Sequence, residues 1–182
     1  MPKAAGHCGG DRRLAACSLH TLSGVPHRAD RTTLSRFRSS CQDRGVTRVR
    51  IAVAGMRFEA RLETELAPRT CARFAAMLPL KTQLIQARWS GEAAWIPFGD
   101  LDLDLGYENH TSYPAPGNLL LYPGGISETE ILFPYGAAVF ASKMGQLAGN
   151  HFATIDAGLE QLPALGKVVL WEGAQDIIFE AV

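Results

Sequence analysis

The stretch RVRIAVAGMRFEARLET, residues 48–64, decides the fold, because apolar and charged side chains alternate along it on both sides of a glycine. Alternation with a period of two places the apolar residues on one face of a strand and the charged residues on the other. Gly55 separates the two runs where the chain must turn. We therefore predict a β-hairpin with one buried face. Its apolar positions are Val49, Ile51 and Val53, then Phe58, Ala60 and Leu62.

The next segment, LAPRTCARFAAMLP (66–79), changes to helical spacing. Its apolar residues occupy positions i, i+3, i+4 and i+7, which form one stripe on a helix: Cys71, Phe74, Ala75 and Leu78. Pro68 suits the first turn of this helix, and Pro79 ends it. We expect Cys71 to be a small core residue, because no electropositive neighbour activates its thiol.

Short apolar segments separated by glycine and proline make up the rest of the chain. We predict strands over 82–89, 92–97, 118–122, 130–133, 137–142 and 151–155, a short helix over 156–166, and closing strands over 167–172 and 175–181. About ten strands with two short helices favour a closed β-barrel, since an open sheet of this size leaves exposed edges. The predicted fold class is therefore mainly β.

Residues 1–47 differ from the rest in charge and composition. They hold eight Lys and Arg against three Asp and Glu, a net charge of +5, whereas residues 48–182 carry −5. Because they lack both a helix or strand period and enough apolar residues to bury, we predict a disordered basic tail before one barrel domain of residues 48–182. A translation start set too far upstream of Val46 is the preferred account of this tail, and an organellar transit peptide is the alternative.

Three of the four cysteines lie in this tail, so Cys71 is left without a disulfide partner inside the barrel domain. The Cys and His pairs at 7–8 and 17–20 are of the types that ligate zinc, but no second tight pair follows them. We therefore predict no metal site and no cofactor.

The charge and hydropathy of the barrel domain argue against two classes of partner. After the tail the only lysines are Lys81, Lys143 and Lys167, too few for a phosphate-binding surface, so nucleic acid is not expected. No apolar run approaches the roughly 20 residues that cross a bilayer, and the first residues lack the apolar core of a secretory signal. We expect a cytoplasmic protein that binds no membrane, and we leave a homo-oligomer open.

Several motifs resemble cyclophilin-like proteins. LAPRTCARF (66–74) resembles the start of a cyclophilin helix, and GNLLLYPGG (117–125) resembles a segment of the smaller bacterial cyclophilin-like proteins. Five further segments are similar to a bacterial family of cyclophilin-like domains of unknown function: ARWSGEAAWIP (87–97), ENHTSYPAPG (108–117), YPGGISETEILFPYG (122–136), FASKMGQLAGNHFATI (140–155) and LWEGAQDI (170–177). The resemblance covers about residues 48–182 and implies a cyclophilin-like barrel.

The wider fold family implies prolyl cis/trans isomerisation, in which an arginine polarises the amide and an apolar pocket holds the proline. Arg88 is the candidate for that arginine. In the AGNHFAT segment, His151 replaces a glutamine of the cyclophilin pattern and Ala153 replaces a pocket phenylalanine. Isomerase activity is therefore kept as the alternative function.

The segment GQLAGNHFATI (145–155) supplies two site candidates, Asn150 and His151. Strict alternation along a strand places His151, Ala153 and Ile155 on one face and Phe152 and Thr154 on the other. An imidazole on an apolar face acts as a general base in a pocket, or is a core histidine bonded to a backbone carbonyl. The sequence leaves both interpretations open.

The loop YENHTSYP (107–114) is dense in hydrogen-bonding side chains, which suits either a small-ligand site or a solvated turn. We take Glu108, Asn109, His110 and Tyr113 from it as candidate ligand-binding residues. If the loop folds over the barrel mouth, Glu108 and His110 join His151 as a set of metal-ligand types, although none has metal-ligand spacing by itself.

The turn RWSGEAAW (88–95) supplies Arg88 as a clamp for a substrate carboxylate, Trp89 or Trp95 as a flat pocket wall, and Glu92. Alternatively, Arg88 and Glu92 form a cross-strand ion pair and both indoles are core residues, which is the favoured interpretation for Trp95. A second acidic pair, Glu128 and Glu130, lies two residues apart on one face of a predicted strand. Such a pair suits acid–base chemistry, although two surface glutamates are the commoner case.

These residues lead to one functional hypothesis with two alternatives. We predict that the barrel binds, and in one version chemically processes, a small polar molecule in a pocket walled by Arg88, Trp89, Tyr113, Tyr122 and His151, with Arg88 and His151 as the catalytic candidates. The alternatives are a prolyl isomerase and a non-enzymatic module for oligomerisation or partner docking. Motifs of common hydrolases, dehydrogenases and zinc proteases are missing.

Overall fold

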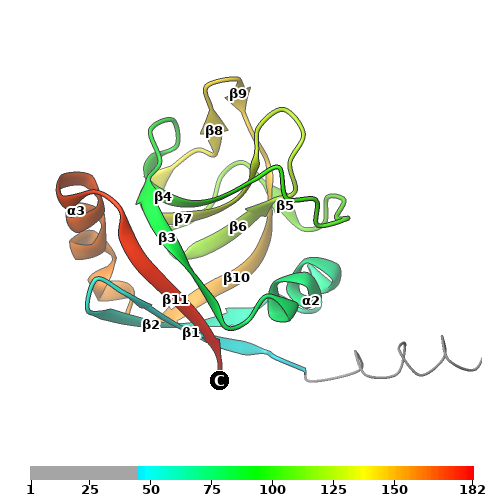
Figure 1. Ribbon diagram of the computed structural model, residues 1–182, viewed down its shortest axis with the longest axis horizontal. Helices are drawn as coiled ribbons and strands as arrows, with labels where there is room; N and C mark the ends of the chain where they lie inside the picture. Colours follow the sequence, from blue (N-terminus) through cyan, green and yellow to red (C-terminus); the bar gives the residue numbers. More distant parts are fainter. Residues whose placement is uncertain (1–44) are drawn as a thin grey trace, which may run out of the picture. The chain divides into compact units, whose positions relative to one another are not determined.

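The computed structural model describes residues 45–182 (Figure 1). The predictions for the basic tail, including its Cys and His pairs, therefore lie almost entirely outside the described residues. Within these residues, neither helix combines the length and the apolar character that crossing a membrane requires.

The hairpin predicted from residues 48–64 is confirmed. Strand β1 (Arg48–Val53) pairs with strand β2 (Met56–Leu62), and the two-residue turn consists of Ala54 and Gly55. Both turn residues have positive φ angles, 50° and 74°. Turns of this kind suit the right-handed twist of paired strands, and glycine adopts such angles without steric cost.

Eight antiparallel strands close into a barrel, as the sequence predicts. The order is β2-β1-β11-β3-β4-β7-β6-β10, and β10 pairs with β2 to close the ring. The remaining barrel strands are β3 (Leu80–Gln86), β4 (Gly91–Gly99), β6 (Asn118–Tyr122), β7 (Thr129–Ala138), β10 (Gly149–Ala157) and β11 (Gln175–Ala181). Strand β5 (His110–Thr111) pairs with β10, and β8 (Ala141–Ser142) and β9 (Gly145–Gln146) form a separate hairpin.

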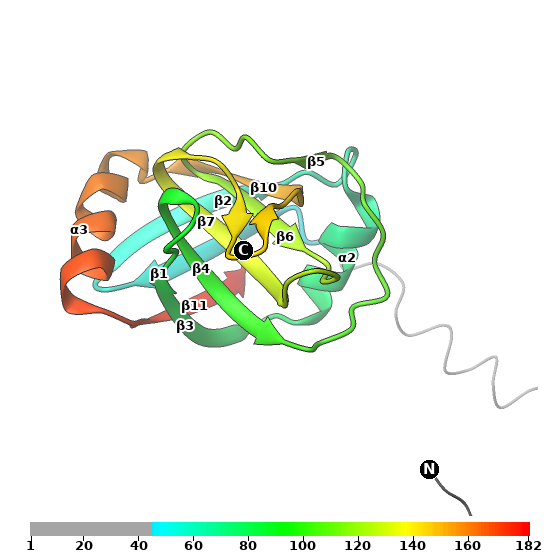
Figure 2. The same cartoon turned by 90° about the horizontal axis from the view of Figure 1, so that it is seen from above.

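Helices α2 (Pro68–Ala76) and α3 (Leu162–Glu172) lie on opposite sides of the barrel (Figures 1 and 2). Helix α2 and its Pro68 start agree with the predicted helix, and Cys71 and Phe74 are buried. The strand predicted over 167–172 is wrong: these residues continue α3, which follows a short 3₁₀ turn η1 (Leu159–Gln161). The buried residues of α3 keep helical spacing through this stretch: Leu162, Leu165, Gly166 and Val169.

Apolar side chains fill the interior of the barrel. The rings of Phe58 on β2 and Phe133 on β7 meet edge to face at 6.0 Å, although these strands are not neighbours in the sheet. Phe74 of α2 contacts the rings of Phe152 and Phe179, at 4.7 and 5.5 Å, so this helix adds to the same core. A filled interior of this kind is typical of an eight-stranded barrel. The barrel interior is therefore filled by side chains.

A second apolar cluster covers the outer face of β4, β7 and β6. It contains Ala87, Ala93, Leu120, Tyr122, Leu132, Phe140 and Leu147, with Trp95 packed against it. Phe140 and Leu147 come from the segment that carries the β8–β9 hairpin, which covers this part of the sheet (Figure 2). The middle of the sheet is thus buried on both faces, which explains why β6 and β7 are nearly continuous apolar runs.

Candidate functional site

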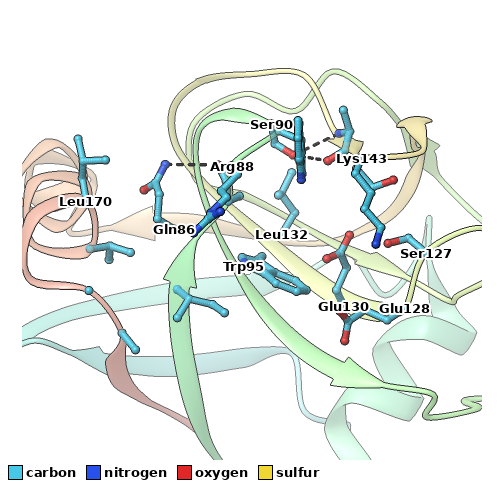
Figure 3. A pocket seen from close by; sticks show the side chains of 18 residues that line it. Gln86, Arg88, Ser90, Trp95, Ser127, Glu128, Glu130, Leu132, Lys143 and Leu170 are labelled. Atoms are coloured by element: carbon cyan, nitrogen blue, oxygen red, sulfur yellow. Dashed lines mark hydrogen bonds between the residues drawn. The ribbon is translucent and has the colours of Figure 1, made fainter.

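A cavity of about 550 Å³ lies against the outer face of β4 and β7 (Figure 3). We call it the Glu130 cavity. Segments far apart in the sequence line it: the β3–β4 turn, the start of β7, the β8–β9 hairpin and the end of α3. The lining residues include Arg88, Trp95, Glu128, Glu130, Lys143 and Leu170.

The alternation of β7 places Glu130 in this cavity. Ile131 and Phe133 belong to the barrel core, so Glu130 and Leu132 point to the outer face. On the neighbouring strand β4, Trp95 pairs with Leu132 and therefore lines the same cavity. Figure 3 shows Trp95 between Arg88 and the two labelled glutamates.

Glu130 is the buried acid of the cavity, with 6% of its surface exposed. Its carboxylate has no hydrogen-bond or ion-pair partner among residues 45–182. Burial, together with the negative charge of Glu128, raises the pKa of Glu130 to about 7. Glu128 itself accepts a hydrogen bond of 3.0 Å from the Gly99 amide. Glu130 can therefore exchange a proton, or accept a donor from a ligand, near neutral pH.

Arg88, Trp89 and Lys143 lie at the exposed rim of the cavity. The alternative ion pair between Arg88 and Glu92 is wrong, because Glu92 accepts a hydrogen bond of 2.8 Å from the Ala137 amide and Arg88 enters none of the ion pairs of the described chain. Glu92 does not line the cavity. The structure thus brings Arg88 and Trp89 into one cavity and leaves Glu92 to support β7.

A second cavity, of about 630 Å³, contains two of the other candidates, His110 and Tyr122. The His110 ring packs against Tyr107 with centroids 5.0 Å apart, and the Tyr122 hydroxyl accepts a hydrogen bond of 3.2 Å from the Ile126 amide. Tyr113 is exposed, and its hydroxyl accepts a hydrogen bond from Gln146. The single predicted pocket is therefore divided: Arg88 and Trp89 lie in one cavity, and Tyr122 lies in another.

Asn150 is fully buried and holds three segments together. Its side-chain oxygen accepts a hydrogen bond from the Glu108 amide at 3.1 Å, and its amide group donates to the Thr70 hydroxyl at 3.0 Å and the Gly106 carbonyl at 2.9 Å. The Glu108 carboxylate accepts hydrogen bonds from the Thr70 amide and hydroxyl, at 2.6 and 2.8 Å, in the first turn of α2. Negative charge there is favourable. These contacts assign structural work to Asn150 and Glu108 and leave the Asn150 amide no free donor for a ligand.

His151 lies in the barrel wall and lines neither cavity. Its Nε2 is 3.0 Å from the Thr154 hydroxyl, which donates to the Glu63 carboxylate at 2.6 Å. Because that hydroxyl proton goes to Glu63, Nε2 must donate to Thr154. Burial lowers the pKa of the His151 imidazole, against an opposing effect of Glu63, so the ring is neutral at pH 7.

The prediction that His151, Ala153 and Ile155 share one face of the strand is wrong. A register shift between His151 and Ala153 interrupts the alternation of β10, so His151 pairs with Leu120 of the outer cluster whereas Ala153 pairs with Leu119 of the core. The Asn109 side chain donates a hydrogen bond of 2.8 Å to the His151 carbonyl beside this bulge. Asn109 thus fastens its loop to β10.

The structure also tests the prediction for Cys71 and the hypothesis of a metal-ligand set. Cys71 is buried and donates its thiol proton to the Phe152 carbonyl, and burial raises its pKa to about 12, which confirms it as a core residue. Across residues 45–182, no three His, Cys, Asp or Glu side chains gather closely enough to hold a metal ion. Glu108, His110 and His151 therefore do not form the metal-ligand set considered from the sequence.

A family model described as "Protein of unknown function (DUF3830)" matches residues 49–181. The chain belongs to the DUF3830 family. No curated protein matches the sequence of this DUF3830 chain. The family match agrees with the predicted membership of a family of unknown function, whereas the cyclophilin-like assignment and the bacterial source stay predictions.

Two solved structures resemble the DUF3830 chain in fold. One is titled "Structure of McbB in complex with tryptophan", with a TM-score of 0.55 and 17% identity, and the match covers 73% of this chain and 44% of the McbB chain. The other is the hypothetical protein AF2241 from Archaeoglobus fulgidus, with a TM-score of 0.50 and 17% identity over 78% of this chain and 99% of that one. At such identity the likeness concerns the barrel fold alone.

The sequence placed neither Glu130 nor Lys143 in the predicted pocket of this DUF3830 chain, and it favoured a core position for Trp95. The spacing of Glu128 and Glu130 did indicate two acids on one face, but it could not show that α3 and the β8–β9 hairpin enclose that face. Trp95 was predicted to be a core residue, and it does pack against the outer cluster while one side lines the cavity. Nothing in the sequence around Lys143 marked it as a cavity residue.

Proposed function

We propose that this DUF3830 barrel binds a small polar molecule in the Glu130 cavity. Of the residues predicted to form the site, Arg88 and Trp89 line this cavity. The observation that carries the proposal is the Glu130 side chain, which is largely buried and whose carboxylate faces the cavity without a partner in the described chain. Its oxygens are accessible from the cavity, since no fully buried side-chain N or O atom of residues 45–182 lacks a hydrogen-bond partner. Burial of the side chain still disfavours the ionised form and raises its pKa to about 7. A ligand that donates a hydrogen bond to the carboxylate offsets this effect.

Size and chemistry support the same proposal. The volume of about 550 Å³ falls within the range of roughly 300–1,000 Å³ that is typical of small-molecule sites. Trp95 and Leu132 supply an apolar floor, while Ser127, Arg88 and Lys143 supply polar groups. The McbB structure, whose title names tryptophan, provides a case in which a protein with a similar barrel is found with a small molecule.

No contact in the described chain favours the prolyl isomerase or the partner-docking alternative over ligand binding. Both stay predictions, as do the cytoplasmic location and a possible homo-oligomer. Processing of the ligand, with Arg88 as a catalytic group, also stays a prediction. The catalytic role expected for His151 loses its support, because this ring lines neither cavity.

A melting-temperature screen tests the proposal. The panel contains amino acids including tryptophan, simple amines, carboxylates, amides and sugars, measured with the wild type, Glu130→Gln and His110→Ala. His110 lines the other cavity and provides the matched control. We expect one or more compounds to raise the midpoint of the wild type and of His110→Ala, since a ligand at about 100 times its Kd stabilises by roughly 2.7 kcal/mol.

The same compounds should stabilise Glu130→Gln clearly less than the wild type. Equal shifts in Glu130→Gln and the wild type would place binding outside this cavity and refute the proposal. A panel in which no compound raises the midpoint would also count against it.

A further inference from the structure

We propose that the ligand of the Glu130 cavity carries a protonated amine, and that the Glu130 carboxylate accepts the hydrogen bond of this ammonium group. This inference rests on the proposed function and deepens it by naming the chemical class of the ligand. It begins from the hydrogen-bonding capacity of the buried side chain. An ionised carboxylate only accepts hydrogen bonds, and no donor of residues 45–182 reaches this one. The carboxylate oxygens are accessible from the cavity, where a ligand can supply a donor.

Charge selects an ammonium among the possible donors. Glu128 lines the same end of the cavity and adds a second negative charge, whose presence disfavours ionisation of Glu130. An amide or a hydroxyl supplies a hydrogen bond but no compensating charge, whereas an ammonium supplies both. Trp95 lines the cavity beside these acids (Figure 3), and the face of an indole ring attracts cations.

The protein's own cations do not occupy this position. Arg88, from the β3–β4 turn, and Lys143, from the β8–β9 turn, both line the cavity but are exposed to water. Neither lies within ion-pair distance of Glu130 or Glu128. Helix α3 contributes only uncharged lining, chiefly Val169 and Leu170. The acidic end of the cavity is therefore open to an external cation.

The pH dependence of binding follows from the ionisation of Glu130. Burial raises the pKa of Glu130 to about 7, and no histidine lines the cavity. An alkyl ammonium, with a pKa near that of lysine at about 10.4, stays protonated throughout this range. Binding of an amine should therefore strengthen by about tenfold from pH 6 to pH 8, as Glu130 ionises. A ligand that accepts a hydrogen bond from protonated Glu130 shows the opposite trend.

The experiment uses three probes with the same ring: 2-phenylethylamine, phenylalanine and 3-phenylpropionate. Calorimetric titration of the full chain at pH 6 and pH 8 compares the wild type with Glu130→Gln and with Glu172→Gln, an exposed glutamate outside the cavity. We expect the two amine probes to bind the wild type and Glu172→Gln, more tightly at pH 8. In Glu130→Gln the affinity should fall at least tenfold and the pH dependence should disappear.

Three outcomes overturn the inference. The first is tighter binding of 3-phenylpropionate than of 2-phenylethylamine, and the second is weaker amine binding at pH 8 than at pH 6. The third is that no amine binds, although a compound of another class from the melting-temperature screen does bind. In each case the proposed function survives if a ligand still depends on Glu130. It fails with the inference only if no compound of any class binds in the cavity.

Discussion

Three buried or half-buried polar side chains, Glu130, Asn150 and His151, differ in whether the protein satisfies them. Asn150 has its donors and acceptor occupied by helix α2 and the loop at residues 106–108, and His151 is bonded to Thr154. Buried polar groups in native proteins nearly always find such partners, and no fully buried side-chain N or O atom of residues 45–182 lacks one. Only Glu130 faces a cavity without a partner in the described chain. Residue type and local pattern could not separate these cases, because each depends on segments distant in the sequence.

The stability of the fold should depend on pH through Glu130. Its pKa of about 7 in the folded protein lies above the ordinary value of 4.5, so between these values the folded chain keeps a proton that the unfolded chain has lost. The stability linked to this proton is fully present below about pH 4.5 and is lost as the pH rises through about 7. We expect Glu130→Gln to be more stable than the wild type by about 3 kcal/mol at pH 8, and nearly equal to it at pH 4.5.

Urea unfolding followed by fluorescence at these two pH values measures the difference. Glu172→Gln, at an exposed position, should follow the wild type within about 0.5 kcal/mol. The expectation would be contradicted if the free energy of unfolding of Glu130→Gln differed from that of the wild type by the same amount at both pH values.

At the scale of elements, the hairpin of residues 48–64 and helix α2 followed directly from their periodicity. Two predictions failed for different physical reasons. The apolar, β-branched run at 167–172 has the composition of a strand, but tertiary packing of its helical stripe against β7, β3 and β4 decides in favour of α3. In β10, the bulge at His151 and Ala153 reverses which face each side chain takes, and a single inserted residue leaves no signal in an apolar segment.

The close packing of α3 on β7 leads to a prediction at Gly166. A Cβ atom at this position would lie 2.4 Å from ring carbons of Tyr135, whose hydroxyl donates a hydrogen bond to Gln86. In an exposed helix, Gly→Ala stabilises by about 1 kcal/mol. Here we expect Gly166→Ala to destabilise by roughly 1–3 kcal/mol, because the ring must move. Thermal unfolding measures this effect.

The exposed substitution Lys167→Ala, one residue along the same helix, is the control and should change stability by less than about 0.5 kcal/mol. In a double-mutant cycle with Tyr135→Ala, the cost of Gly166→Ala should largely vanish. A cost that persists without the Tyr135 ring would show that another contact opposes the methyl group.

At the scale of the whole molecule, a closed, mainly β barrel could be predicted, and the position of its cavity could not. Alternating apolar residues and short strands are enough to favour a barrel with a filled interior. The Glu130 cavity instead lies on the outer face and combines residues from 85–90, 95, 127–132, 141–143 and 169–174. Their convergence depends on how the β8–β9 hairpin and α3 lie on the sheet, which no local spacing records.

We expect backbone amides of the barrel strands to exchange hydrogen slowly and those of the β8–β9 hairpin to exchange it fast. Strand β10 pairs with β2, β6 and β5, so its amides open only with the barrel, whereas β8 and β9 are two-residue strands paired only with each other. We expect the amides of the β8–β9 hairpin to exchange at least about a hundredfold faster than those of β10. Mass spectrometry of peptic fragments resolves the two segments, and equal protection would contradict the division.

Strand β7 assigns neighbouring positions to two separate tasks. Ile131 and Phe133 pack inside the barrel, whereas Glu130 and Leu132 face the outer cavity, with Leu132 also packed in the outer apolar cluster. Mutation of Glu130 therefore changes the chemistry of the cavity wall without repacking the barrel interior. A protein engineer could use the same division to graft a new specificity onto this wall.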